Sequence, residues 1–114
     1  MRRLVPVLCL VSCGPVIAKL PASETDPLTV TVSGHREVQR GELWRFDERL
    51  ARRGAGDQCQ ALCSSHTLIC GLATRICEAA KTNPAHERAK TTCEAATATC
   101  RDTNVRLPEE CFCR

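Results

Sequence analysis

The fold of this chain is decided by the stretch from Cys59 to Cys77, CQALCSSHTLICGLATRIC, and by a shorter stretch from Cys93 to Cys100, CEAATATC. In a helix that turns by ~100° per residue, the cysteines at 59, 63, 70 and 77 fall within roughly 40° of one another. Apolar side chains widen this stripe on one side, namely Leu62, Ile69, Ala73, Ile76 and Ala80. The pattern predicts an amphipathic helix whose buried face carries cysteines.

The shorter stretch predicts a second helix that runs in the opposite direction. Its two cysteines are again seven residues apart, and small residues flank them at Ala89 and Ala96. The pairs Cys77–Cys93 and Cys70–Cys100 share a midpoint at position 85. A chain that folds back near this position brings both pairs together, and the small neighbours allow the ~5.5–6 Å between Cα atoms that a disulfide needs. We therefore predict these two disulfides.

Polar residues and a proline mark the ends of both helices. Asp57 followed by Gln60 has the spacing of a capping box at the start of the first helix. Asn83 is a good N-cap for the second helix, and Pro84 suits its first position. The expected fold is all-α, an antiparallel hairpin with helices at about 57–81 and 84–104.

The C-terminal tail carries the remaining two cysteines. Pro108 prevents the second helix from continuing, so residues 109–114 are expected to be extended. An extended C-x-C advances about 6.6–6.8 Å, close to the ~6 Å of one helical turn that separates the first two cysteines of the hairpin. Laid antiparallel on that turn, the tail directs Phe112 away from the helix and forms the pairs Cys63–Cys111 and Cys59–Cys113. The reverse pairing requires a turn, which Pro108 could supply.

Composition explains why the cysteines matter. The chain has 114 residues and ten cysteines, but its aromatic side chains are only Trp44, Phe46 and Phe112. So small an apolar inventory cannot stabilise a domain alone, and disulfides are the usual remedy in exported proteins. Lys and Arg number 16 against 13 Asp and Glu, with both signs interspersed. This pattern excludes a basic stripe for nucleic acid. The layout resembles the broad class of cysteine-stapled α-hairpins, which implies an architecture and no activity.

The first residues of the chain indicate a signal peptide for export. Arg2 and Arg3 are followed by an apolar stretch from Leu4 to Val11, which is far shorter than the ~20 residues that span a bilayer. Leu10-Val11-Ser12-Cys13 resembles the lipobox of bacterial lipoproteins. The resemblance implies that residues 1–12 are a signal peptide and that Cys13 is acylated. It also extends to the short cysteine-rich lipoproteins of some bacteria, which implies nothing about activity.

Two cleavage sites compete in this leader. The lipobox places the mature N-terminus at Cys13, and Gly14 in place of Asp then implies the outer membrane. Val16-Ile17-Ala18 instead suits ordinary signal peptidase, and cleavage there yields a secreted or periplasmic protein that begins at Lys19. The expected localisation is the cell envelope, with the lipid anchor preferred. An even eight cysteines remain for the disulfide framework under either cleavage.

Between the leader and the hairpin we expect two further segments. Residues 13–36 contain Pro15, Pro21 and Pro27 among polar residues, which predicts a flexible tether. Alternation at Leu28, Val30 and Val32 gives this tether a weak strand signal. Residues 37–53 are expected to form an amphipathic helix, because Leu43, Phe46 and Leu50 share a face. Trp44 and Phe46 either pack on the cysteine-rich module of residues 57–114 or contact a protein partner or a membrane.

Metal binding is the alternative to a disulfide framework. Thiolates that line helices bind Cu(I) or Zn(II), and His66 lies between Cys63 and Cys70 on the same face. The sequence lacks a C-x2-C pair, however, and an exported chain is oxidised. We therefore expect no metal site and no cofactor, with His66 and His86 at the surface or boundary. No catalytic motif accompanies the cysteines.

These observations predict a non-enzymatic envelope protein that acts as a structural or interaction module. Its expected contacts are the membrane, through Cys13, and a protein partner through Trp44 and Phe46. A soft-metal protein that uses helical cysteines is the alternative function.

Overall fold

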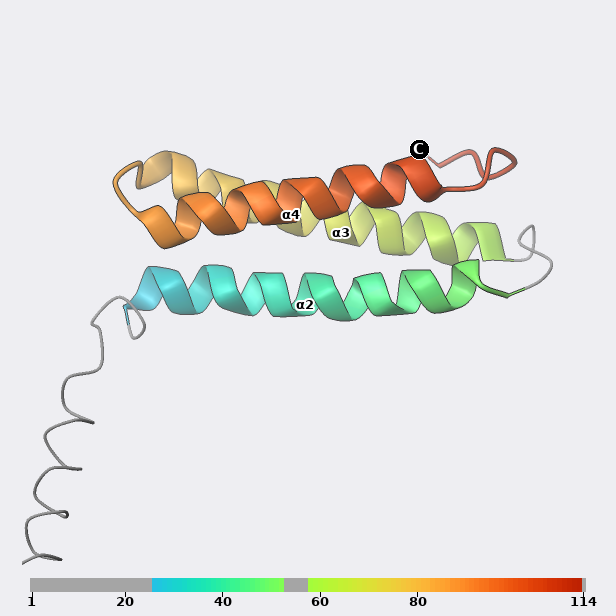
Figure 1. Cartoon of the computed structure of the whole chain (residues 1–114), viewed down its shortest axis with the longest axis horizontal. Coiled ribbons are helices and arrows are strands. Elements are labelled where there is room, and N and C mark those ends of the chain that lie inside the picture. The colour runs from blue at the N-terminus through green and yellow to red at the C-terminus, as the bar shows by residue number, and fades with distance from the viewer. Residues whose placement is uncertain (1–25, 53–57, 114) are drawn as a thin grey trace, which may run out of the picture.

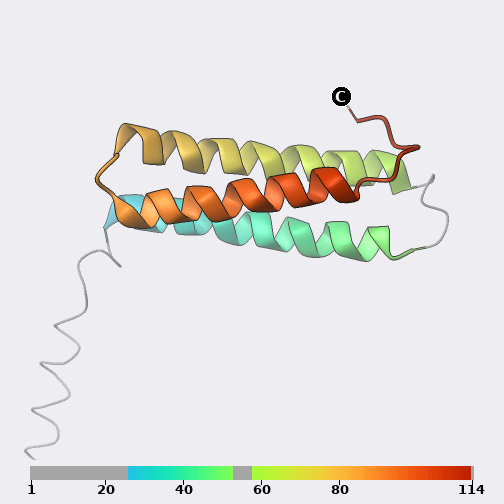
Figure 2. The same cartoon turned by 45° about the horizontal axis from the view of Figure 1, so that its top comes forward.

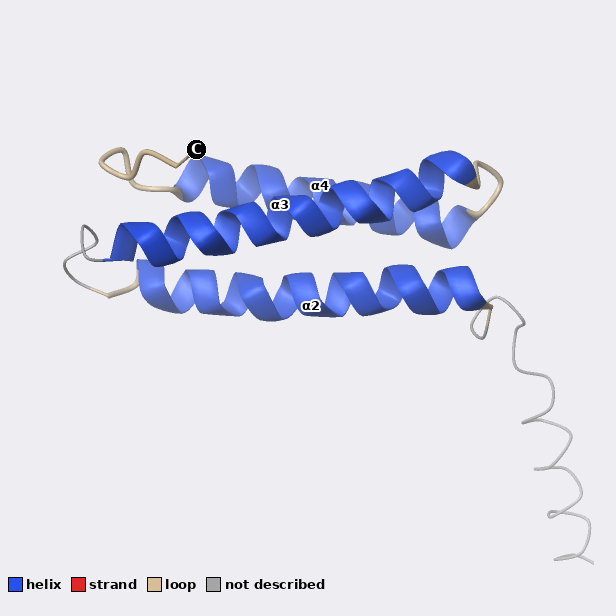
Figure 3. Cartoon of the chain, turned by 180° about the vertical axis from the view of Figure 1, so that it is seen from behind, coloured by secondary structure: helices blue, strands red, loops and turns tan. Residues whose placement is uncertain are grey.

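The computed structural model describes residues 26–52 and 58–113 as three long helices (Figure 1). They are α2 (Pro27–Leu50), α3 (Cys59–Thr82) and α4 (Glu87–Arg106). The chain reverses after α2 and again after α3, so α3 runs antiparallel to the other two helices (Figures 1 and 2). No strand occurs in the described ranges (Figure 3). The predicted all-α fold with an antiparallel hairpin is confirmed, while the predicted signal peptide of residues 1–12 and residues 13–25 of the tether lie outside these ranges.

The helix before the hairpin is longer than predicted. α2 begins at Pro27 rather than near residue 37, and it matches α3 in length at 24 residues. Asp26 caps it by accepting hydrogen bonds from the Thr29 amide at 3.0 Å and the Thr29 hydroxyl at 2.9 Å. The strand signal was wrong because Val32 faces the core while Val30 faces solvent, as a helix requires.

The ends of the hairpin helices differ from prediction at the turn. Asn83 does not cap α4; it lies at the C-terminus of α3, where its side-chain amide donates to the Ala79 carbonyl at 2.9 Å. The residue that caps α4 is His86, whose Nδ1 accepts from the Ala89 amide at 3.1 Å. Asp57 of the predicted capping box lies outside the described residues, and Gln58 precedes α3 without a side-chain capping bond.

The three helices share a small core that has two parts. The part near the α3–α4 turn is formed by Val32, Ala73, Ile76, Ala89 and Ala96. The part near the tail is formed by Phe46, Leu62, Ile69 and Cys111. Small residues dominate the first part, which allows the helices to approach closely. So little apolar burial makes the disulfides a major part of the stability.

A buried glutamine joins α2 to the hairpin between these two parts. Gln39 is fully buried, and its Nε2 donates to the main-chain carbonyls of Ile69 and Ala96, each at 3.0 Å. Its Oε1 accepts from Arg36 at 2.6 Å, and Arg36 also donates to the Thr99 hydroxyl at 3.0 Å. One side chain therefore contacts both helices of the hairpin and keeps all its polar atoms bonded.

Arg106 makes a second polar connection at the tail end. Its guanidinium pairs with Asp47 of α2 at 2.8 Å and with Asp102 of α4 at 3.0 Å. The same group lies 5.3 Å from the centre of the Phe46 ring. The contact places a cation over an aromatic face that is otherwise enclosed by the core.

Candidate functional site

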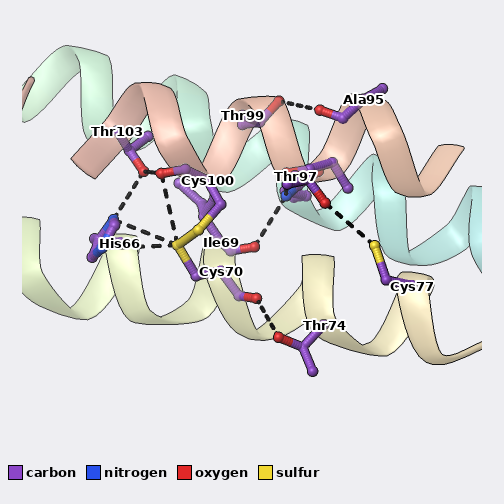
Figure 4. The surroundings of a disulfide bond; sticks show 12 residues. His66, Ile69, Cys70, Thr74, Cys77, Ala95, Thr97, Thr99, Cys100 and Thr103 are labelled. Carbon is purple, nitrogen blue, oxygen red and sulfur yellow. Dashed lines mark hydrogen bonds between the residues drawn. A yellow bond between two sulfur atoms is a disulfide. The ribbon is translucent and has the colours of Figure 1, made fainter. Parts of the chain in front are cut away.

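The structure pairs the eight cysteines of the module as four disulfides. Cys77–Cys93 and Cys70–Cys100 join α3 to α4 with Cα separations of 4.7 and 4.8 Å. Both were predicted from the shared midpoint, and both are confirmed. Figure 4 shows the Cys70–Cys100 bond between the two helices, with Thr97 close to Cys77 further along.

The outer two pairs are the reverse of the prediction. The tail forms Cys59–Cys111 and Cys63–Cys113, with Cα separations of 5.2 and 5.3 Å. The cause is a turn in which the Cys111 amide donates to the Pro108 carbonyl at 3.0 Å. The chain passes beyond the start of α3 and then turns back over it (Figure 2). Because the strides of helix and tail match in either direction, their match did not fix the direction of the tail.

His66 is half-buried beside the Cys70–Cys100 disulfide. Its Nδ1 lies 2.9 Å from the Thr103 hydroxyl and 3.7 Å from the Cys70 sulfur (Figure 4). Burial lowers the pKa of its imidazole. The metal alternative needs free thiolates beside this ring, but Cys70 is bonded to Cys100. Residues 26–52 and 58–113 hold no group of three or more His, Cys, Asp or Glu side chains that could bind a metal ion.

The two aromatic residues predicted as partner contacts differ in their exposure to solvent. Phe46 is fully buried against Leu62 and Ile69, so it cannot contact a partner in the folded protein. Trp44 remains 62% exposed on the outer side of α2. The packing interpretation thus holds for Phe46 alone.

The most exposed aromatic side chain is one that the sequence analysis did not select. Phe112 is 85% exposed, although both of its chain neighbours are held by disulfides to α3. Its main chain is thereby fixed on either side while its ring stands in solvent. The C-x-C pattern correctly predicted that the ring turns away from the helix. The pattern could also have indicated that this ring is fixed in place.

An open hollow lies beside this ring. It has a volume of about 670 Å³ and lies between Phe112 and the first half of α3. We call the exposed residues around it the Phe112 surface, defined by Gln60, Ser64, Thr67, Leu68 and Phe112. Leu68 is 45% exposed and adds a second apolar group.

None of the five residues that define the Phe112 surface is charged, whereas a second hollow that Phe112 also lines includes Glu109. The sequence from Gln58 to Thr74 contains no Asp, Glu, Lys or Arg, although a quarter of the whole chain is charged. Depletion of charge together with a large aromatic side chain is typical of the centre of a protein–protein interface.

The fold and this surface together define a disulfide-stapled three-helix module whose exposed Phe112 ring lies beside an uncharged hollow. Comparisons with models of known protein families, with curated proteins and with solved structures find no match to the chain. No helix in the described part is both long and apolar enough to cross a membrane.

Proposed function

We propose that this chain is an exported, non-enzymatic protein of the cell envelope that acts as an interaction module. The main observation behind this proposal is that the Phe112 ring is 85% exposed. Two disulfides nevertheless fix the main chain on either side of it. Exposed apolar side chains are common on proteins. A rigidly held one beside a charge-free hollow is typical of a binding residue, because little conformational entropy is lost on contact.

The disulfides support export. Eight cysteines form four bonds within residues 59–113, and such a density is typical of oxidising compartments outside the cytosol. The basic and apolar leader before them agrees with the same interpretation. We further propose that Cys13 carries the lipid and that Gly14 directs the protein to the outer membrane.

The position of Asp26 suggests how an anchored molecule is oriented. The chain from Cys13 enters the bundle at Asp26, next to His86 in the α3–α4 turn. Phe112 lies at the opposite end of the bundle, because disulfides hold both of its chain neighbours to the start of α3. The 24 residues of α2 span about 36 Å, so the Phe112 surface would stand well away from the lipid.

Detergent partition of the full chain tests the anchor. We expect the wild-type protein to enter the detergent phase and Cys13→Ala to remain aqueous with its leader uncleaved. Cys9→Ala is the matched control, because it removes a leader cysteine outside the lipobox and should partition like wild type. A mature N-terminus at Lys19 would instead show a soluble secreted protein.

Two further measurements test the rest of the proposal. The intact mass without reductant should lack eight hydrogens, whereas free thiols with bound metal would support the soft-metal alternative. Cross-linking in intact cells, followed by mass spectrometry, should recover peptides from the Phe112 surface joined to another protein chain. Cross-links confined to other faces would contradict the assignment of this surface.

A further inference from the structure

We infer that the Cys77–Cys93 disulfide is a site of thiol–disulfide exchange, which a low-molecular-weight thiol opens before the other three bonds. The inference goes beyond the proposed function and does not depend on it. Cys77 lines an open hollow of about 360 Å³ between α3 and α4. Cys70 and Cys100 line the same hollow, so a small thiol that enters it meets two disulfides. The two bonds differ in the groups that lie beside their sulfur atoms.

A threonine hydroxyl lies beside the Cys77 sulfur. Thr97 Oγ1 is 3.3 Å from this atom (Figure 4). Because a disulfide sulfur carries no proton, the hydroxyl is the donor. Other threonine hydroxyls in α3 and α4 donate to main-chain carbonyls instead, namely those of Thr74, Thr82, Thr91, Thr92, Thr99 and Thr103. Within residues 26–52 and 58–113, no other hydroxyl donates to a cystine sulfur.

This hydroxyl favours the reduced form of Cys77. A thiolate is a much stronger acceptor than a disulfide sulfur, so Thr97 stabilises Cys77 once the bond is open. The Cys93 main-chain carbonyl lies 3.5 Å from the same sulfur and can accept the proton of a Cys77 thiol. Glu78 and Lys81 are the charged residues that line the hollow, and their opposite charges offset each other. A disulfide whose reduced form is stabilised is the more easily reduced.

The imidazole of His66 gives Cys70 no equivalent donor. The Thr103 hydroxyl donates to the Cys100 carbonyl at 2.9 Å, so its oxygen accepts from His66 Nδ1, which also lies 2.9 Å away. Burial lowers the pKa of this imidazole, which favours the neutral ring with a single proton. That proton is directed at Thr103, so none is left for the Cys70 sulfur.

The exchange takes place in two balanced steps. A thiolate in the hollow attacks Cys77 Sγ. The S–S bond breaks, its electron pair passes to Cys93 Sγ, and that sulfur takes a proton from water. A second thiol group then attacks the outer sulfur of the mixed disulfide, and Cys77 leaves as the thiolate to which Thr97 donates. Two thiols are oxidised to one disulfide while one cystine is reduced to two cysteines.

Loss of this bond leaves the rest of the disulfide framework in place. Its sequence separation of 16 residues is the smallest of the four, against 30, 50 and 52 for the others. Because the stabilising effect of a disulfide grows with loop length, removal of this bond costs the least. The chain is therefore expected to stay folded when Cys77–Cys93 alone is open.

Equilibration of the oxidised full chain with dithiothreitol, followed by rapid alkylation and peptide mapping, tests the inference. We expect Cys77 and Cys93 to be alkylated at the lowest dithiothreitol concentration. Thr97→Val keeps the shape of the side chain but removes the donor. It should lower the equilibrium constant for reduction of this bond about 5–10-fold at pH 9. At pH 6, where thiolates are scarce, the change should be less than about 2-fold.

Two variants control for a purely structural effect. Thr97→Ser keeps the hydroxyl and should behave like wild type. Thr74→Val is the matched control, because Thr74 lines the same hollow while its hydroxyl donates to the Cys70 carbonyl at 3.1 Å. It should leave the reduction of Cys77–Cys93 unchanged, and circular dichroism of each oxidised variant checks folding.

The order of reduction in the wild-type chain tests the inference even where a variant does not fold. Reduction of any other disulfide before Cys77–Cys93 would overturn it. A folded Thr97→Val variant that is reduced like wild type at pH 9 would also overturn it, as would an equal loss in Thr74→Val.

Discussion

Asp26 and His86 form a 3.0 Å hydrogen bond that joins the start of α2 to the turn between α3 and α4. The His86 Nδ1 accepts from the Ala89 amide at 3.1 Å, so the Nε2 atom is the one that donates to the carboxylate. Asp26 meanwhile accepts from the Thr29 amide. The two residues therefore cap two helices and also hold those helices together at one end of the bundle.

This pair predicts how acid affects the fold. The Thr29 amide, followed by His86, lowers the pKa of Asp26 from 3.8 to about 2. A carboxylate with a depressed folded-state pKa stabilises the protein above its unfolded pKa, and the contribution is lost as pH falls through the folded value. We expect the urea midpoint to fall between pH 3.8 and about pH 2 as this contribution disappears.

Asp26→Asn is the control for this effect, because asparagine also caps helices but does not titrate. Its urea midpoint should fall less steeply across the same pH range. The comparison cancels the other carboxylates, which are common to both proteins. Superimposable pH profiles for the two proteins would show that Asp26 contributes nothing.

Gln39 predicts a large effect from a single polar substitution. Gln39→Leu keeps a side chain of similar size but removes the donors to the Ile69 and Ala96 carbonyls and the acceptor for Arg36. Loss of these buried bonds should lower the free energy of unfolding by about 1–3 kcal/mol. Gln39→Glu should cost more at neutral pH, because it buries a carboxylate against two carbonyl oxygens.

Urea unfolding of both variants with intact disulfides measures the difference. Stability of Gln39→Glu should improve as its carboxyl group is protonated, and Gln39→Leu should show no such change relative to wild type. Equal stability of Gln39→Leu and wild type would mean that the polar contacts do not hold α2 on the hairpin.

How far the sequence specified this fold differs between its parts. The hairpin could be predicted because the pairs Cys77–Cys93 and Cys70–Cys100 share a midpoint at residue 85, which lies in the turn that Asn83 and Pro84 indicate. The sequence pattern did not predict the N-terminal half of α2, because a polar residue occupies a core position in this helix. Gln39 faces the hairpin, and a glutamine there interrupts the apolar period by which a buried helix face is detected. Asp26 followed by Pro27 was nevertheless a helix-start signal.

The candidate site could be predicted only in part. The cysteines were identifiable from spacing, but the direction of the tail depends on the turn at Pro108, which spacing alone does not reveal. The charge-free run from Gln58 to Thr74 is visible in the sequence. The sequence also predicted that the tail is bonded to Cys59 and Cys63 with Phe112 turned away from the helix, but the hollow beside the ring became visible only in the structure.

The two tail disulfides predict unequal losses of stability. Their sequence separations are 52 and 50 residues, so the loop-entropy contributions are nearly the same. Cys111, however, is only 8% exposed and packs in the core, whereas Cys113 is half-buried beside Phe112. Each bond typically contributes about 2–4 kcal/mol. Replacing Cys59 and Cys111 together by Ala should therefore cost more than replacing Cys63 and Cys113 together.

Guanidinium unfolding of the two double variants measures this order, and peptide mapping of the unreduced protein checks the pairing. Peptides with Cys59 should be linked to Cys111. A link from Cys59 to Cys113 would mean that the tail does not turn back at Pro108.

Phe46 and Trp44 predict opposite results from the same substitution. Phe46 is fully buried against Leu62 and Ile69 with Arg106 over its ring. Phe46→Ala should therefore lower the free energy of unfolding by about 3–5 kcal/mol, because it leaves a cavity in a small core. Trp44→Ala removes a larger side chain, but one that is 62% exposed, and should change stability by less than about 0.5 kcal/mol.

Chemical unfolding followed by circular dichroism, with disulfides intact, separates these outcomes. Phe46→Leu should lie between Phe46→Ala and wild type, since it refills most of the cavity but loses the aromatic face under Arg106. Because Phe46 is enclosed, any loss of partner binding in Phe46→Ala should track the fraction unfolded and vanish under conditions that restore folding. A Phe46→Ala variant as stable as wild type would mean that α2 does not pack on the hairpin through this residue.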